Sequence, residues 1–192
     1  SGSTSWSGLG SWEMWYQPII DAAIERDAAV IAANAPRRYV RIARSDGWER
    51  IDALDASRRG LVDHPDTPLT GAYRDRFMDL MGGHGEDGVD TEQNEESLAI
   101  AESYFLAQQV WDATMAASIS AALERSGPPV LLLVGRFHSD LDGGTGMQVK
   151  RLHPAARVVS ISLEPDCDVV EFDAESPQAD LIVCTGTAAS SP

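Results

Sequence analysis

A histidine directly after a run of apolar residues is the feature of this sequence best suited to chemistry. Residues 128–144 read PPVLLLVGRFHSDLDGG, so His138 stands three residues after Gly135, where a buried strand would end. Such a histidine can accept a proton, bind a metal or cofactor, or close a turn as a polar residue. The residues by themselves leave these roles open.

Arginines stand at two predicted strand ends. Arg37 and Arg38 follow the apolar run 28–34, and Arg136 follows the run 130–134. Because the carboxyl ends of parallel strands meet at one edge of a sheet, we expect these arginines and the histidine to border one crevice. Guanidinium groups bind carboxylates and phosphates through paired hydrogen bonds, so the crevice would suit an anionic ligand. Local pairing of the arginines with Asp or Glu is the alternative.

Two polar residues interrupt the apolar stripe of a long predicted helix. The stripe consists of Leu98, Ala101, Phe105, Gln108, Asp112, Met115, Ile119 and Ala122. A stripe at this spacing faces the core, where polar side chains need hydrogen-bond partners. We therefore expect Gln108 and Asp112 to bond to backbone groups of the loop 135–140; direct contact with a ligand is the alternative.

The elements that must position these residues alternate between helices and strands. Helices are predicted at 12–26, 35–47, 71–81 and 91–127, and strands at 28–34, 130–134, 157–163, 168–172 and 180–184. This order predicts an α/β fold, with a mainly parallel sheet flanked by helices on both faces and a smaller helical subdomain inserted.

The predicted fold divides the chain into segments. Residues 1–11 are expected to be a linker or a cloning scar, and residues 186–192 a tail. Residues 12–47 and 98–185 would form the α/β domain, and residues 48–97 the helical insertion. A chain of 192 residues is long enough for one domain with a small subdomain.

The composition argues against several classes of partner. The net charge of −15 opposes binding to nucleic acid, which needs a basic surface. No apolar run approaches the length of a transmembrane helix, so we expect no direct membrane insertion. The two cysteines, Cys167 and Cys184, lie in or beside apolar runs and are expected to be free thiols; one bridge between them is the alternative.

Five segments together resemble a known family. WEMWYQPIIDAA, AANAPRRYVR, AYRDRFMDLMGGHG, AQQVWDATMA and LLLVGRFHSDLDGGTGMQ occur in the order expected of ChaN-like haem-binding uptake proteins of the Tiki superfamily. The resemblance extends over residues 11–185 and implies an α/β domain with a smaller helical domain, haem as cofactor and a homodimer. It also implies relation to lipoproteins, with a location in the cell envelope, periplasmic or lipid-anchored, if a signal was removed from the N-terminus.

The resemblance further implies that haem lies between the two parts of the chain or between two subunits, with iron held by a tyrosine or histidine. Carried over by motif, Tyr73 in AYRDRF and His84 in GGHG are the candidate iron ligands. Tyrosinate suits Fe(III), and imidazole suits either oxidation state. The remaining implied cofactor-binding residues would meet the propionates or order the crevice floor: Arg37, Arg38, Arg136 and His138.

One part of the family pattern is absent from this sequence. Relatives begin with a strand that carries a Gly-Glu-x-His segment, and here a Ser/Gly-rich stretch stands before Trp12. The sheet would then lack one strand and expose an edge that invites pairing with another chain.

The absent segment also bears on catalysis. Hydrolases of the superfamily rely on such N-terminal acidic and histidine groups, so we expect non-catalytic haem binding rather than an enzyme. The alternatives are a metal-dependent hydrolase centred on His138 with Asp140 or Asp112, and a truncated domain that serves only as an interaction module.

Overall fold

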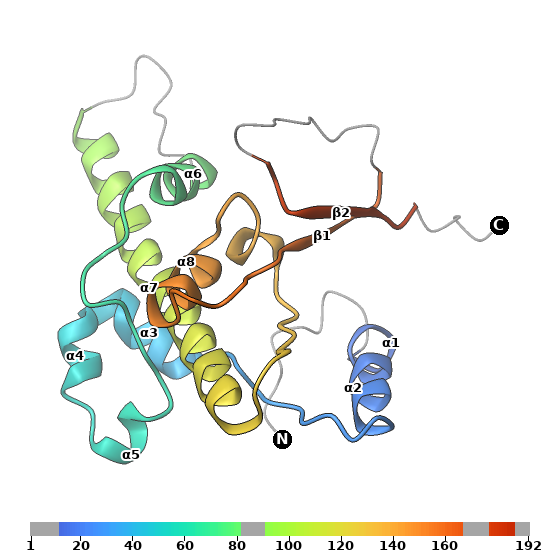
Figure 1. Cartoon of the computed structure of the whole chain (residues 1–192). Helices are drawn as coiled ribbons and strands as arrows, with labels where there is room; N and C mark the ends of the chain where they lie inside the picture. Colours follow the sequence, from blue (N-terminus) through green and yellow to red (C-terminus); the bar gives the residue numbers. More distant parts are fainter. Residues whose placement is uncertain (1–11, 82–90, 167–176, 187–192) are drawn as a thin grey trace. The chain divides into compact units, whose positions relative to one another are not determined.

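The computed structural model describes residues 12–81, 91–166 and 177–186, which Figure 1 shows in colour. The chain divides into two compact units, residues 1–32 and 33–192. The helices are α1 (Trp12–Trp15), α2 (Gln17–Ile24), α3 (Arg37–Asp46), α4 (Trp48–Asp52), α5 (Ala56–Arg59), α6 (Ala72–Leu80), α7 (Thr91–Ser126) and α8 (Gly144–Leu152). The 3₁₀ turn η1 (Arg136–His138) and the strands β1 (Ile161–Glu164) and β2 (Leu181–Cys184) complete the described elements.

The first unit holds two short helices where the sequence predicts one. The break falls at Tyr16, because Pro18 occupies the first turn of α2 and has no N–H to donate to the turn before it. The rings of Trp12 and Tyr16 stack at 5.1 Å between centroids, and the indole of Trp12 donates to Gln17 Oε1 at 3.0 Å. These contacts close the turn between α1 and α2.

Helix α7 forms the centre of the second unit. Helices α3, α6 and α8 all pack against it (Figure 1). The predicted helix over 91–127 is confirmed, and it ends where Gly127 takes a φ of 71° and donates its N–H to Leu123 O at 2.9 Å. A positive φ suits glycine, which has no Cβ to clash with the preceding turn.

Two apolar clusters hold the helices of this unit together. Buried residues of the first cluster, on α3, α7 and the segments around α4, are Ala35, Tyr39, Val40, Ala43, Ile51, Val62, Ala107 and Val110. Those of the second, on α6 and α7, are Tyr73, Phe77, Met78, Ala101 and Phe105. Because α7 is covered on more than one face, its centre is buried beyond the single stripe that periodicity predicts.

The predicted fold class is wrong. Helices account for 55% of the described residues, and the sheet described consists of β1 and β2 alone. These strands are parallel, as predicted, with Ile161 opposite Leu181 and Glu164 opposite Cys184. The predicted strands 28–34 and 130–134 form no strand, and 168–172 lies outside the described residues. The chain is therefore a mostly helical protein with a small parallel sheet.

The physical reason is the lack of pairing partners. An apolar run becomes a strand only when a neighbouring strand accepts and donates its backbone hydrogen bonds. The described part of the chain offers the run 130–134 no such neighbour, and Leu131 and Leu133 stay 79% and 55% exposed.

The expectation of free thiols is also wrong at Cys184, which is disulfide-bonded. Among the described helices, none combines the length and apolarity needed to cross a membrane.

Candidate functional site

A buried carboxylate on α7 gathers polar side chains from three other elements. Asp112 is fully buried, and the Tyr73 hydroxyl donates to its Oδ2 at 2.5 Å. The Thr145 hydroxyl donates to its Oδ1 at 2.7 Å, and His138 Nδ1 lies 2.7 Å from the same oxygen. Buried charge is tolerated only when hydrogen bonds surround it, and Asp112 meets that condition.

Local structure explains why these groups can reach one carboxylate. Tyr73 lies in the first turn of α6, His138 ends η1, and Thr145 lies in the first turn of α8. Gly144 lets the backbone of α8 approach closely, since a Cβ there would lie 2.3 Å from Asp112 Oδ2. The N-terminal, positive dipole end of α8 thus lies close to the carboxylate of Asp112.

The predicted contact of the two polar residues on α7 is confirmed in its location, although side chains make it instead of the loop backbone. Gln108 Nε2 lies 3.1 Å from His138 Nδ1, and it donates to the Tyr73 hydroxyl at 3.2 Å. Gln108 and Asp112 therefore hold both the 136–138 turn and α6 against α7. The two polar residues that interrupt the stripe therefore connect α7 to α6 and to η1 through hydrogen bonds.

The phenol of Tyr73 is held in its protonated form. Burial raises its pKa well above the ordinary value, and the negative charge of Asp112 raises it further. Its ring packs between Phe105 and Phe137, with centroids at 5.7 and 5.4 Å. This environment opposes the phenolate that Fe(III) coordination requires.

We expect Tyr73 to ionise only as the protein unfolds in alkali. Its folded pKa is raised above the unfolded value of about 10. The stability it contributes is therefore complete below that pH and is lost as the pH rises above it. Ultraviolet phenolate absorbance during alkaline titration checks this, because Tyr73→Phe should lack one tyrosine's share of the phenolate signal that accompanies unfolding. A Tyr73 phenol that titrates near its ordinary pKa in the folded protein would contradict the expectation.

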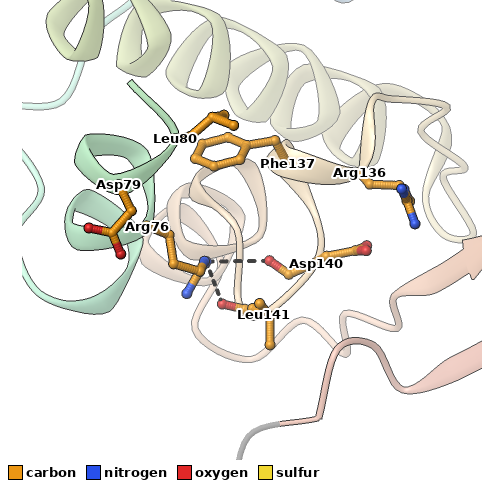
Figure 2. A pocket seen from close by; sticks show the side chains of 7 residues that line it. All are labelled: Arg76, Asp79, Leu80, Arg136, Phe137, Asp140 and Leu141. Atoms are coloured by element: carbon orange, nitrogen blue, oxygen red, sulfur yellow. Dashed lines mark hydrogen bonds between the residues drawn. The ribbon is translucent and has the colours of Figure 1, made fainter. Parts of the chain in front are cut away.

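A pocket of about 660 Å³ adjoins this cluster, because its lining residue Phe137 packs against the ring of Tyr73. Figure 2 shows the residues that line it. Its lining comes from α6, from η1 and from the loop after η1, and consists of Arg76, Asp79, Leu80, Arg136, Phe137, Asp140 and Leu141. Arg76 donates through Nη2 to Leu141 O at 2.8 Å, which ties α6 to that loop. Phe137, Leu80 and Leu141 are the apolar lining residues, and the pocket also holds two guanidinium groups and the carboxylates of Asp79 and Asp140.

Arg136 is oriented by a polar network at the end of β1. It forms an ion pair with Glu164, whose carboxylate also accepts from Gln178 Nε2 at 2.6 Å. The hydrogen bond from Gln178 lowers the pKa of Glu164, and Arg136 lowers it further. Asp140 accepts from Ser162 and Gln178, both at 2.9 Å, so its carboxylate is engaged on the side of the strands.

The structure brings together some of the predicted site residues. Arg136 lines the pocket, and Tyr73 and His138 meet at Asp112. Arg37 and Arg38 are exposed on α3 and are not among the pocket residues; Arg38 lies over the ring of Tyr39 at 4.5 Å. His84 lies outside the described residues.

Two contributors were missed by sequence reasoning. Arg76 follows Tyr73 by three residues and so shares a face of α6, a signal that helical spacing could have supplied. Thr145 lies in the first turn of α8, and no spacing signal in the sequence marks it as a partner of Asp112. Among the described residues, no group of three or more His, Cys, Asp or Glu is placed to hold a metal ion.

A family model described as haem-binding uptake, Tiki superfamily, ChaN matches residues 2–149 of the chain. The chain belongs to this family. The matched span includes α6, α7, η1 and most of α8, the elements that build the cluster and contribute to the pocket. Comparisons with curated proteins and with solved structures gave no match.

Haem is the ligand that this ChaN-type family implies, and the pocket offers groups suited to two parts of it, the macrocycle and the propionates. Haem presents a flat apolar macrocycle, two carboxylates and an iron that takes an axial ligand. Phe137 and the two leucines can cover apolar surface, and Arg76 and Arg136 retain N–H donors beyond those already used. None of the lining residues is of a type that commonly binds haem iron; Tyr73 and His138, which are of such a type, meet at Asp112.

Proposed function

We propose that this ChaN-like protein binds haem at the pocket that is lined by α6, η1 and the loop after η1, and that its role is non-catalytic. The observation that carries the proposal is the pairing of two guanidinium groups with apolar walls in one cavity, on a chain of a haem-binding family. When haem binds here, its macrocycle would leave water and contact the side chains of Phe137, Leu80 and Leu141. Removal of that apolar surface from water provides the main attraction.

Arg76 and Arg136 would bind the propionates in this proposal. Arg76 is fixed by a backbone carbonyl, and Arg136 by Glu164, so neither side chain has to be ordered anew when a carboxylate arrives. Each guanidinium carries five N–H donors, and a carboxylate needs two of them. The positive charges are local, because the chain as a whole carries a net charge of −15. Arginine contacts therefore decide where an anionic porphyrin can dock.

Titration with hemin tests the proposal. We expect a saturable shift of the Soret band, and an affinity roughly 10- to 150-fold weaker in Arg76→Gln and in Arg136→Gln, since a charge-assisted hydrogen bond contributes about 1.5–3 kcal/mol. Arg58→Gln is the matched control, because Arg58 is exposed, pairs with Asp55 and does not line the pocket. A wild-type protein with no saturable shift would exclude the proposed function.

Hemin titration also tests Arg37 and Arg38, the predicted propionate ligands outside the pocket. Arg37 and Arg38 remain a prediction from the family resemblance, and the double variant Arg37→Gln/Arg38→Gln measures their share of propionate binding. The predicted homodimer also remains a prediction. The exposed side chains of Leu131, Leu133 and Leu163 are apolar surface that self-association could cover.

A further inference from the structure

We propose that the exposed arginines of α3 form a docking surface for an acidic polypeptide segment of a partner protein. This surface, the α3 arginine face, consists of Arg37, Arg38, Arg41 and Arg44. None of the four lines the pocket proposed for haem. The inference therefore goes beyond the proposed function and does not depend on it.

The buried side of α3 fixes the direction of the arginines. Tyr39, Val40 and Ala43 are buried in one apolar cluster with Ala107 and Val110 of α7. Because these contacts prevent the helix from rotating, the four arginines stay exposed to solvent. At a rise of about 1.5 Å per residue, they extend over roughly 10 Å of the helix axis.

The arginines of this face lack acidic partners in a chain that is rich in them. The chain has 30 acidic and 15 basic residues, and six described basic side chains pair with a carboxylate: Arg58, Arg59, Arg74, Arg136, Lys150 and Arg151. Within residues 12–81, 91–166 and 177–186, no arginine of the α3 arginine face does so. Local pairing, the alternative interpretation of Arg37 and Arg38, is thus not what the described structure contains.

The helix itself gains no stability from its first two arginines. Arg37 and Arg38 lie in the first turn of α3, which contains no acidic residue. The positive end of the helix dipole lies there, so cationic side chains at this place destabilise the helix. Helix stability therefore does not account for these two charges.

Aromatic rings hold two of the guanidinium groups in place. The guanidinium of Arg38 lies 4.5 Å from the ring centroid of Tyr39 and donates to its hydroxyl at 3.2 Å. That of Arg44 lies 3.8 Å from the ring centroid of Tyr104 on α7. A stacked guanidinium keeps its charge and most of its N–H donors. Less side-chain entropy is then lost when a carboxylate binds.

An acidic polypeptide suits this face better than a membrane or a nucleic acid. Side-chain carboxylates accept paired hydrogen bonds from guanidinium groups. Helices that bind membranes insert an apolar face, whereas the apolar residues of α3 are buried against α7. A membrane or a nucleic acid would also bring an extended anionic surface close to a chain of net charge −15. A short acidic segment can contact the arginines alone.

Fluorescence anisotropy with a labelled glutamate octapeptide tests the proposal. We expect saturable binding that weakens as NaCl is added, because salt screens exposed charges. The variant Arg41→Gln/Arg44→Gln should bind the peptide roughly 3- to 25-fold more weakly, since an exposed ion pair contributes up to about fivefold. Arg44→Lys keeps the charge and should retain more of the affinity than Arg44→Gln.

The variant Arg58→Gln/Lys150→Gln is the matched control. It removes the same number of positive charges from exposed side chains that already pair with Asp55 and Asp142. We expect its affinity for the peptide to stay within about twofold of the wild type. Equal losses in the two double variants would reduce the effect to net charge and overturn the docking surface.

Further outcomes would also overturn the proposal. These are the absence of saturable peptide binding by the wild type, and binding of phosphatidylserine vesicles or of a DNA oligonucleotide in place of the peptide. Displacement of the peptide by hemin would assign the arginines to propionates instead. Hemin titration keeps the two proposals distinguishable, because Arg41→Gln/Arg44→Gln should bind hemin like the wild type. A wild type that binds the peptide but not hemin would defeat only the proposed function.

Discussion

Replacement of Asp112 by alanine will lower the free energy of unfolding by about 3–5 kcal/mol. The carboxylate is fully buried and is approached by the Tyr73 hydroxyl, the Thr145 hydroxyl and His138 Nδ1. Alanine removes the acceptor of all these groups at once, and water cannot replace it without opening the helix contacts. Urea unfolding followed by circular dichroism measures the change.

Asp112→Asn is the informative companion. It keeps the volume of the side chain and one acceptor oxygen, but it brings an NH₂ group to a position where the wild type accepts hydrogen bonds. We expect a loss of about 1–3 kcal/mol, smaller than that of the alanine variant. An Asp112→Ala protein within about 0.5 kcal/mol of the wild type would behave like an ordinary surface substitution, and the described network would then be wrong.

Replacement of Gly144 by alanine will destabilise the protein by about 2–3 kcal/mol. A Cβ at this position would lie 2.3 Å from Asp112 Oδ2 and 2.7 Å from Tyr73 Cε1. Both neighbours are buried and hydrogen-bonded to each other, so they cannot move aside without breaking that bond. Helix α8 must shift away from α7, and the free energy of unfolding should fall accordingly.

Gly146 offers a matched control two residues along the same helix. A Cβ there meets nothing within 4 Å, so Gly146→Ala should be neutral or stabilise the protein by up to about 1 kcal/mol through helix propensity. Thermal and urea unfolding of both variants give the comparison. Equal changes in the free energy of unfolding for the two variants would show that α8 packs less closely against Asp112 and Tyr73 than the structure describes.

The helices could be predicted because their signals are local. The helix over 91–127 ends at a glycine followed by two prolines, and the helix over 35–47 begins beside Pro36 and ends at Gly47. The structure confirms both within two residues. The polar interruption at Gln108 and Asp112 likewise marked a contact with the 135–140 segment, since buried polar groups must find partners.

The sheet could not be predicted in the same way. The run 130–134 has the composition of a buried strand, yet Leu131 is 79% exposed and the segment pairs with no described strand. Composition states only that a segment could be a strand, whereas pairing depends on which other segments lie beside it. The α/β prediction failed because it assumed neighbours for 28–34 and 130–134 that the described chain does not provide.

The sequence by itself determined the positions of the main helices, the family and the place where α7 would meet a polar loop. These depend on spacing, on end signals and on motif order, all of which can be read along the chain. The tertiary structure alone decided that Tyr73 is buried against Asp112, that Arg76 shares a pocket with Arg136, and that Nδ1 of His138 is the engaged nitrogen. These facts depend on which side chains meet across helices, and local periodicity carries no information on partners far apart in the sequence.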